Sequence, residues 1–128
     1  MDSVSNQIDS FLKFLRNCQE ANRIAAIQEI DMDNATQDIL HNIELSENYP
    51  DDYILQGITL ANIRKKRREA KNTQRVTFPV TQWSKDNQKV INDLEKLLGS
   101  VRKAEKATRN RTYTNRTDIL DGILEKEK

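Results

Sequence analysis

Five cationic side chains are spaced so that one face of a helix would carry all of them. They are separated by three, one, three and four residues in the stretch that follows Ile63. At about 3.6 residues per turn, this spacing places them along a single helical face. Arginine presents a planar fork of N–H donors that matches phosphate and carboxylate oxygens. The sequence therefore predicts an anion-binding surface, here named the basic stripe, which consists of Arg64, Arg67, Arg68, Lys71 and Arg75.

Asp38, His41 and Glu44 follow one another at intervals of three residues. On a helix, this spacing places the two acids and the imidazole along one ridge. Such groups can contribute to a metal site, but His41 is the only histidine, so no second helix supplies a matching ligand. We therefore expect no metal. We interpret the three residues as a polar network that pairs with solvent or with arginines, for which Arg64 and Arg68 of the following helix are the natural candidates.

A second group of cations lies near the C-terminus, in a polar stretch without hydrophobic periodicity. This pattern is typical of a loop or arm that contacts phosphates or a partner. Its candidate partner-binding residues are Arg109, Arg111, Tyr113 and Arg116. Residues 118–124 then predict a short amphipathic helix, which must dock elsewhere because a helix of that length is unstable alone. The expected division is a helical bundle at 1–108 and a basic arm with a docking helix at 109–128.

Sequence motifs that would support catalysis are missing. There is no glycine-rich phosphate loop, no Ser-His-Asp or Cys-His arrangement and no zinc ribbon. With one histidine and one cysteine, the chain offers almost no nucleophile or general base for nucleophilic catalysis. A helical nucleotide hydrolase would need several acids converging on magnesium, and the repeated E-x-x-E pattern of such sites is absent. We expect a protein that is not an enzyme and holds no cofactor.

The composition favours an all-α protein, organised as a helical bundle. Of the 128 residues, 32% are charged and only 3 are Gly and 2 Pro, so the turn residues of an all-β fold are scarce. The single cysteine, Cys18, excludes an intrachain disulfide. No apolar run approaches the ~20 residues that cross a bilayer, and the acidic N-terminus is not a signal peptide. We therefore expect a cytoplasmic protein without membrane contact.

The two halves of the chain carry opposite charge. Residues 1–62 contain three basic and eleven acidic residues, which leaves −8, and residues 63–128 contain 18 basic and nine acidic residues, which leaves +9. Two interpretations remain open. The halves face each other within one chain or between chains, or the basic half meets a polyanion while the acidic half stays away from it.

Hydrophobic spacing and helix-breaking residues predict where the elements lie. The N-terminal segment forms either one bent helix or two short ones, at about 4–17 and 20–31, and polar residues 31–34 separate it from a helix at about 35–46. Pro50, followed by two acids, starts a long central basic helix that ends near Arg75. Pro79 predicts an extended connection at 76–80. Its apolar side chains, which we expect to pin it over the bundle, are Phe78, Val80 and Trp83.

Ser84 is expected to cap a last long helix in which apolar residues alternate by four and three. This heptad seam consists of Val90, Leu94, Leu97, Val101 and Ala104. It is long enough to pair with a helix of this chain or of a symmetry mate, and we expect a homo-oligomer. Phe11 and Phe14 supply either core packing or a dimer seam. Trp83 serves as an anchor or as a base-stacking platform.

Residues 36–45 read TQDILHNIEL and residues 63–72 read IRKKRREAKN, with Tyr113-Thr114-Asn115-Arg116 later in the chain. These segments resemble small, largely uncharacterised proteins from phages and prophages of Gram-positive bacteria, which share T-Q-D-x-x-H-x-x-E-L, R-x-x-R-R-x-x-K and Y-T-x-R patterns. The resemblance implies a setting, a small phage accessory protein in a bacterial host cell that acts on host machinery or host defence by binding. It also singles out a set of special positions, namely Asp38, His41, Glu44, Arg64, Arg67, Arg68, Lys71, Tyr113 and Arg116.

Three classes of function follow. The favoured one is a non-enzymatic phage protein that inhibits a host factor, for instance of an antiviral defence system, or sequesters a phosphorylated or nucleotide ligand through the basic stripe. The alternative is a nucleic-acid-binding accessory protein of phage replication or transcription. The acidic N-terminal half and a pI near 7.8 argue against that alternative. A metal-dependent nucleotide hydrolase is the least favoured.

Overall fold

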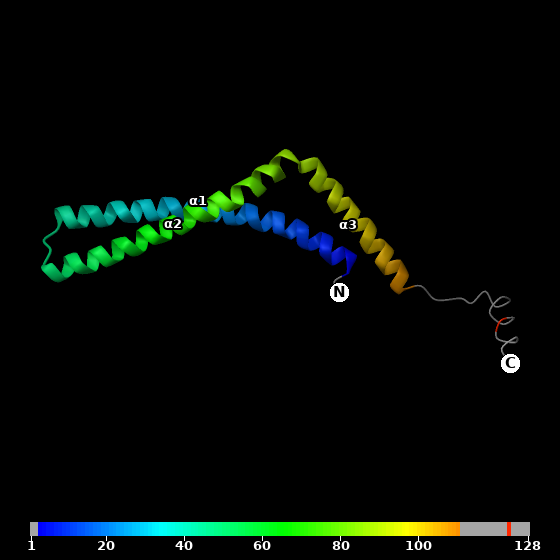
Figure 1. The fold of residues 1–128 in the computed structure, drawn as a ribbon, viewed down its shortest axis with the longest axis horizontal. Coiled ribbons are helices and arrows are strands. Elements are labelled where there is room, and N and C mark those ends of the chain that lie inside the picture. Colours follow the sequence, from blue (N-terminus) through cyan, green and yellow to red (C-terminus); the bar gives the residue numbers. More distant parts are fainter. Residues whose placement is uncertain (1–2, 111–122, 124–128) are drawn as a thin grey trace.

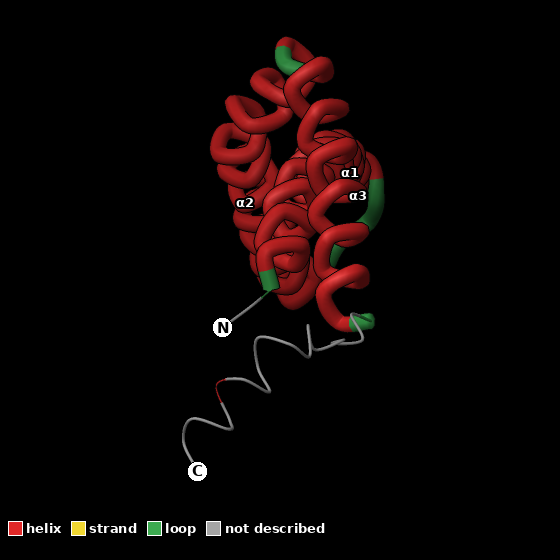
Figure 2. Tube along the Cα trace, turned by 90° about the vertical axis from the view of Figure 1, so that its right-hand side faces the viewer, coloured by secondary structure: helices red, strands yellow, loops and turns green. Residues whose placement is uncertain are grey.

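The computed structural model describes residues 3–110 and Ile123, and residues 3–110 form three helices (Figure 1). They are α1 (Val4–Leu45), α2 (Pro50–Asp86) and α3 (Gln88–Arg109). α1 and α2 form a long antiparallel hairpin, and α3 turns back at Asn87 to lie beside the N-terminal half of α1 (Figures 1 and 2). α1 packs mainly against α2 and less against α3, whereas α2 and α3 barely touch. The predicted all-α fold is confirmed.

The loop between α1 and α2 is held by one asparagine. The Asn48 side-chain amide donates to the carbonyls of Asn42, Ile43 and Ser46 at 3.1, 3.4 and 3.0 Å, and so ties the loop to the last turn of α1. The Tyr49 N–H donates to the Asp52 carboxylate at 2.9 Å, which closes a capping contact at the start of α2. α2 begins at Pro50, as its proline and acids predicted.

The face that α2 turns to α1 is a heptad seam, although many of its residues are polar. Its less exposed positions alternate by three and four residues and are Leu60, Ile63, Arg67, Ala70, Gln74, Thr77, Thr81 and Ser84. Asn22 of α1 donates to the Thr77 hydroxyl at 3.1 Å and to the Gln74 carbonyl at 3.3 Å. The middle of the hairpin is therefore joined by hydrogen bonds rather than by a continuous apolar core.

The apolar core is correspondingly thin. Among the described residues, the buried apolar side chains are Leu12, Leu15, Ala25, Ala70 and Leu98, and no large side chain is fully enclosed. Many large apolar side chains stay exposed, and Leu45, at 78% exposure, is the extreme case. A single copy of the chain thus leaves much apolar surface in water, which is unusual for a protein that works as a monomer.

α1 corrects the prediction of a break. The expected interruption at 31–34 and the division into shorter helices are wrong, because α1 runs without interruption from Val4 to Leu45. Asp33 has a better partner than a helix cap, since it forms ion pairs with Arg67 and Arg64 of α2. The Thr36 hydroxyl donates to the Met32 carbonyl at 2.8 Å and so fits inside the helix. Polar residues that resemble a helix break therefore form contacts within α1 and with α2 instead.

The predicted extended connection at 76–80 is also wrong. Pro79 lies inside α2, which continues past Arg75 to Asp86. Thr77 and Thr81 stand on either side of the proline and face α1, and the Thr81 hydroxyl donates to the Thr77 carbonyl at 3.0 Å. The hydroxyl of Ser84 donates to the Val80 carbonyl at 2.9 Å. Ser84 is therefore buried within α2 and does not cap the last helix. Asn87 separates α2 from α3, and its side chain donates to the Trp83 carbonyl at 2.9 Å.

Several apolar residues that were expected to pack are exposed. Phe78 and Trp83 lie on the outer side of α2, so they do not pin a connection. In α3 the buried position is Leu98, while Val90 and Leu97 of the predicted seam are exposed. Phe11 and Phe14 are 45% and 50% exposed and stack on each other with ring centroids 6.4 Å apart. Core packing of these two rings within the chain is thereby excluded.

Candidate functional site

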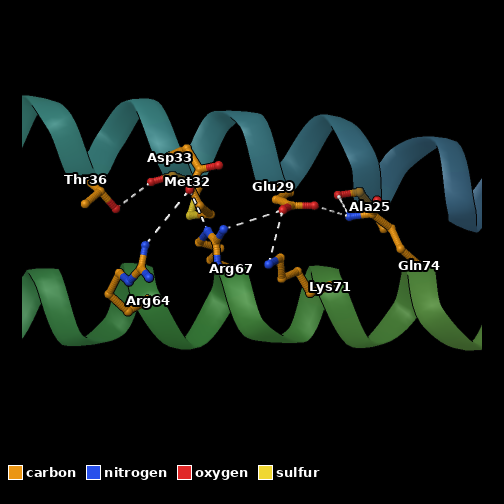
Figure 3. Close-up of polar contacts among 9 residues, drawn as sticks. All are labelled: Ala25, Glu29, Met32, Asp33, Thr36, Arg64, Arg67, Lys71 and Gln74. Atoms are coloured by element: carbon orange, nitrogen blue, oxygen red, sulfur yellow. Dashed lines mark hydrogen bonds and ion pairs between the residues drawn. The ribbon is translucent and has the colours of Figure 1, made fainter.

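The basic stripe lies on α2, but its members face different surroundings. Arg67 occupies a seam position, because the heptad of less exposed residues on α2 passes through it. Its guanidinium points at α1, where Glu29 and Asp33 stand one turn apart (Figure 3). Arg64 and Lys71 lie beside the seam, while Arg68 and Arg75 lie farther out. The helix thus divides the five cations into two groups. The inner group consists of Arg64, Arg67 and Lys71, and the outer group consists of Arg68 and Arg75.

Arg67 is the centre of the inner group. Its Nε donates to Oδ1 of Asp33 at 2.5 Å, and its Nη2 lies 3.6 Å from Oε1 of Glu29. With only 21% of the side chain exposed, Arg67 is screened from solvent more than the rest of the stripe. Arg64 lies 4.0 Å from Asp33 and Lys71 4.0 Å from Glu29. Two α1 acids therefore form ion pairs with three of the five cations (Figure 3).

Gln74 adds a neutral contact to the same cluster. Its side-chain amide donates to Oε2 of Glu29 at 2.6 Å and to the Ala25 carbonyl at 3.4 Å. Glu29 thus accepts from Gln74 with one oxygen and faces Arg67 and Lys71 with the other. The carboxylate is fully engaged, so this part of the surface is a structural tie between α1 and α2.

The outer group is free to meet an external anion. Arg68 and Arg75 are exposed and form no hydrogen bond or ion pair with any other residue that the structure describes. They stand seven residues apart, which is two turns or about 10 Å along the helix. A shallow recess of about 230 Å³ lies between them, lined by Glu29, Arg68, Lys71, Asn72, Gln74 and Arg75. Two unpaired guanidinium forks therefore border one polar recess.

The three residues of the predicted polar network do not meet the basic stripe. Asp38, His41 and Glu44 are exposed and make no hydrogen bond or ion pair within the described part of the chain. Arg64 pairs with Asp33 instead, and Arg68 with none of them. The reason is helical phase. In an uninterrupted α1, Glu29 and Asp33 share the side that faces α2, which turns Asp38 and His41 outward.

A second polar cluster joins the start of α1 to the end of α3. Oε2 of Glu105 accepts from the Ser5 N–H at 3.3 Å, and Asp9 lies 2.9 Å from Lys13 and 3.7 Å from Arg102. The hydrogen bond with the Ser5 side chain, aided by that with its backbone, lowers the pKa of Glu105. The hydrogen bond from Lys13 lowers the pKa of Asp9, and Arg102 contributes through its charge. Both carboxylates are therefore stabilised in their charged form.

The C-terminal candidates are mostly beyond what the structure describes. Arg109 is the last residue of α3 and is exposed. Arg111, Tyr113 and Arg116 lie outside the described residues, as does most of the predicted docking helix at 118–124. Their roles and the predicted boundary at residue 108 stay predictions.

Comparisons with known proteins leave the chain without an assigned family. No protein-family model, no curated protein and no solved structure matches it. The resemblance to phage proteins therefore stays a prediction. Residues 3–110 contain no group of three or more acids, histidines or cysteines arranged to hold a metal ion. None of the three described helices combines the length and apolarity needed to span a bilayer.

Sequence reasoning missed the α1 side of the cluster. Glu29 and Asp33 are spaced by four residues, and Asn22 lies one heptad before Glu29. That spacing is the available signal, but it becomes visible only when α1 is treated as one helix. The expected break at 31–34 concealed it.

Proposed function

We propose that the chain is a binding protein that docks onto an acidic surface of a host protein through the outer cations of the basic stripe. The observation that carries this proposal is the state of Arg68 and Arg75. Both are exposed without a carboxylate partner in the described structure, while their neighbours Arg67 and Lys71 are held by Glu29. Arginine forks in this state are ready to make bidentate contacts with carboxylates.

An extended protein surface suits this site better than a small ligand. The recess between the two arginines is about 230 Å³ and bears the carboxylate of Glu29, whereas ligand pockets usually enclose about 300–1,000 Å³. Two cations about 10 Å apart on a convex helix match acids displayed on another helix or sheet. The phage resemblance supports a host protein as the partner and inhibition, for instance of a defence factor, as the result. No step of this proposal requires catalysis.

A capture experiment with matched variants tests the proposal. Tagged wild-type protein, Arg68→Glu/Arg75→Glu and Lys65→Glu/Lys66→Glu would be expressed in a Gram-positive host, crosslinked and purified. The two variants have the same net charge, but Lys65 and Lys66 lie on the same helix outside the basic stripe. We expect the arginine variant to lose the captured protein by about tenfold or more, since charged contacts of this kind contribute about 1.4 kcal/mol or more. The lysine variant should retain it.

The same material distinguishes the other candidates. Equal capture by the wild type and the arginine variant would refute the proposal. A raised ratio of absorbance at 260 to 280 nm with no captured protein would point to nucleotide or nucleic acid instead. In that case, an affinity that falls steeply with salt would identify a phosphate-dominated contact.

A further inference from the structure

The two ends of the hairpin have opposite chemistry. The first end, here named the tip, comprises residues 38–58, which include the last turns of α1, the loop and the first turns of α2. No lysine or arginine lies between Arg23 and Arg64. The acids of the tip are Asp38, Glu44, Glu47, Asp51 and Asp52. Its exposed large apolar side chains are Leu40, Leu45, Tyr49, Tyr53, Ile54, Leu55 and Ile58.

The other end carries a groove between the start of α1 and the end of α3. This groove, here named the basic groove, encloses about 910 Å³. Val4, Val101 and Ala104 provide apolar lining. Among the described residues that line it, the cations are Lys106, Arg109 and Arg102, the last of which lies 3.7 Å from Asp9. The one acid among them, Glu105, already accepts hydrogen bonds from Ser5. The exposed Phe11–Phe14 pair lies on α1 at the same end of the hairpin.

The tip and the basic groove cannot meet within one chain. They lie at opposite ends of the hairpin (Figure 1), and the 42 residues of α1 span about 63 Å between them. An acidic apolar surface and a basic apolar groove on the same chain are complementary only when two chains come together. An antiparallel arrangement brings each tip to the other chain's groove. A parallel arrangement would place five acids against five acids.

We propose that two copies pair antiparallel, with the tip of each copy docked in the basic groove of the other. Two such contacts related by a twofold axis close the assembly, so the pair is a dimer with no unused tip or groove. The thin core of the single chain fits this arrangement, because the partner covers apolar side chains at both ends. The contact does not involve Arg68 or Arg75, so dimerisation and host-protein binding can be tested separately.

Charge reversal on separate chains provides a specific test. One variant, Asp38→Lys/Glu44→Lys/Glu47→Lys, has a basic tip, because its three lysines outnumber the two remaining acids, Asp51 and Asp52. Its lysine at position 44 suits the C-terminal end of a helix. The second variant, Lys106→Glu/Arg109→Glu, has an acidic groove. Each variant alone places like charges in both contacts, so we expect its dimerisation to weaken by about tenfold or more. A mixture restores opposite charges in both contacts, and native mass spectrometry should then show a heterodimer.

Labelled chains test the orientation independently. In a Cys18→Ser background, Ser46→Cys places a dye at the tip and Ser100→Cys places one on α3 near the groove. Both serines are exposed. Energy transfer between a tip-labelled and a groove-labelled chain should exceed transfer between two tip-labelled chains. Circular dichroism checks that every variant keeps its helices.

Several results would overturn the proposal. They are a wild-type chain that stays monomeric at high micromolar concentration, stronger transfer between two tips than between tip and groove, or a charge-reversed mixture that forms no more dimer than its components. A groove filled instead by the C-terminal segment of the same chain would give the first of these results.

Discussion

The Nε of Arg67 donates to Oδ1 of Asp33 across the interface between α1 and α2, at a separation of 34 residues in the chain. The same guanidinium faces Glu29. A slip of the two helices by one heptad would place Arg67 opposite residues near 22 and 26 or near 36 and 40, and none of these is acidic. The contact therefore selects one register for a seam whose polar residues would otherwise tolerate several.

Arg67 should contribute more to stability than its neighbour Arg64. Arg67→Ala removes the closest cation from both Asp33 and Glu29 and should lower the free energy of unfolding by about 1–3 kcal/mol. Arg64 is 51% exposed and 4.0 Å from Asp33, so Arg64→Ala should change the free energy of unfolding by about 0.5 kcal/mol or less. Urea unfolding followed by circular dichroism, at one protein concentration, measures both. Equal losses would contradict the assigned role of Arg67.

Replacing a polar seam residue should stabilise the hairpin. Thr81 is 7% exposed, and its hydroxyl only returns to the Thr77 carbonyl at 3.0 Å, so it joins no second helix. Thr81→Val keeps the shape and removes a buried hydroxyl, and we expect a gain of about 0.5–1 kcal/mol. Thr59→Val is the matched control, because its hydroxyl makes the same bond to Leu55 but is exposed. A gain at Thr59 as large as at Thr81 would show that helix propensity, not the seam, is responsible.

Pro79→Ala should raise the stability of α2. The proline removes one helical hydrogen bond, to the Arg75 carbonyl, and such a residue inside a helix costs up to about 3 kcal/mol. We expect the alanine variant to unfold at a higher temperature. Pro50→Ala serves as the comparison, since Pro50 is the first residue of α2, where its missing N–H costs nothing. If residues 76–80 were extended as the sequence suggested, Pro79→Ala would bring no such gain.

The contact between Glu105 and Ser5 should loosen in acid. Because the folded chain lowers the pKa of Glu105 below its usual value of 4.5, the charged form contributes stability above that pH. The contribution is lost as the pH falls through the lowered pKa of the folded chain. Ser5→Ala removes the side-chain hydrogen bond and should move the Glu105 midpoint, measured by NMR titration, back toward 4.5. An unchanged midpoint would assign the lowering to other groups.

Local signals in the sequence were sufficient for part of the fold. Pro50 and the acids after it specify the start of α2 without any tertiary partner. The scarcity of glycine and proline was enough to predict an all-α chain. These features act within one helical turn, so they can be evaluated from the sequence alone.

The errors arose where distant residues decide the outcome. From the sequence alone, Asp33 resembles a helix cap, but its ion pair with Arg67 of α2 keeps it inside α1. Pro79 resembles a helix break, but Thr77 and Thr81 on either side of it pack on α1. The basic stripe was predicted as one uniform face for the same reason. Only the phase of α1 shows that Glu29 and Asp33 form ion pairs with its inner members and leave Arg68 and Arg75 available.

The sequence separation of the contacts along the hairpin also bears on the order in which the chain folds. The partners that close the loop are 3 residues apart at Tyr49 and Asp52, the Arg67–Asp33 partners 34 apart, and the Ser5–Glu105 partners 100 apart. Closing the last of these from the open chain costs about 1 kcal/mol more conformational entropy than closing the second. We therefore expect folding to begin at the loop and to advance toward the termini. On this order, we expect α3 to attach last and, by the same logic, to detach first.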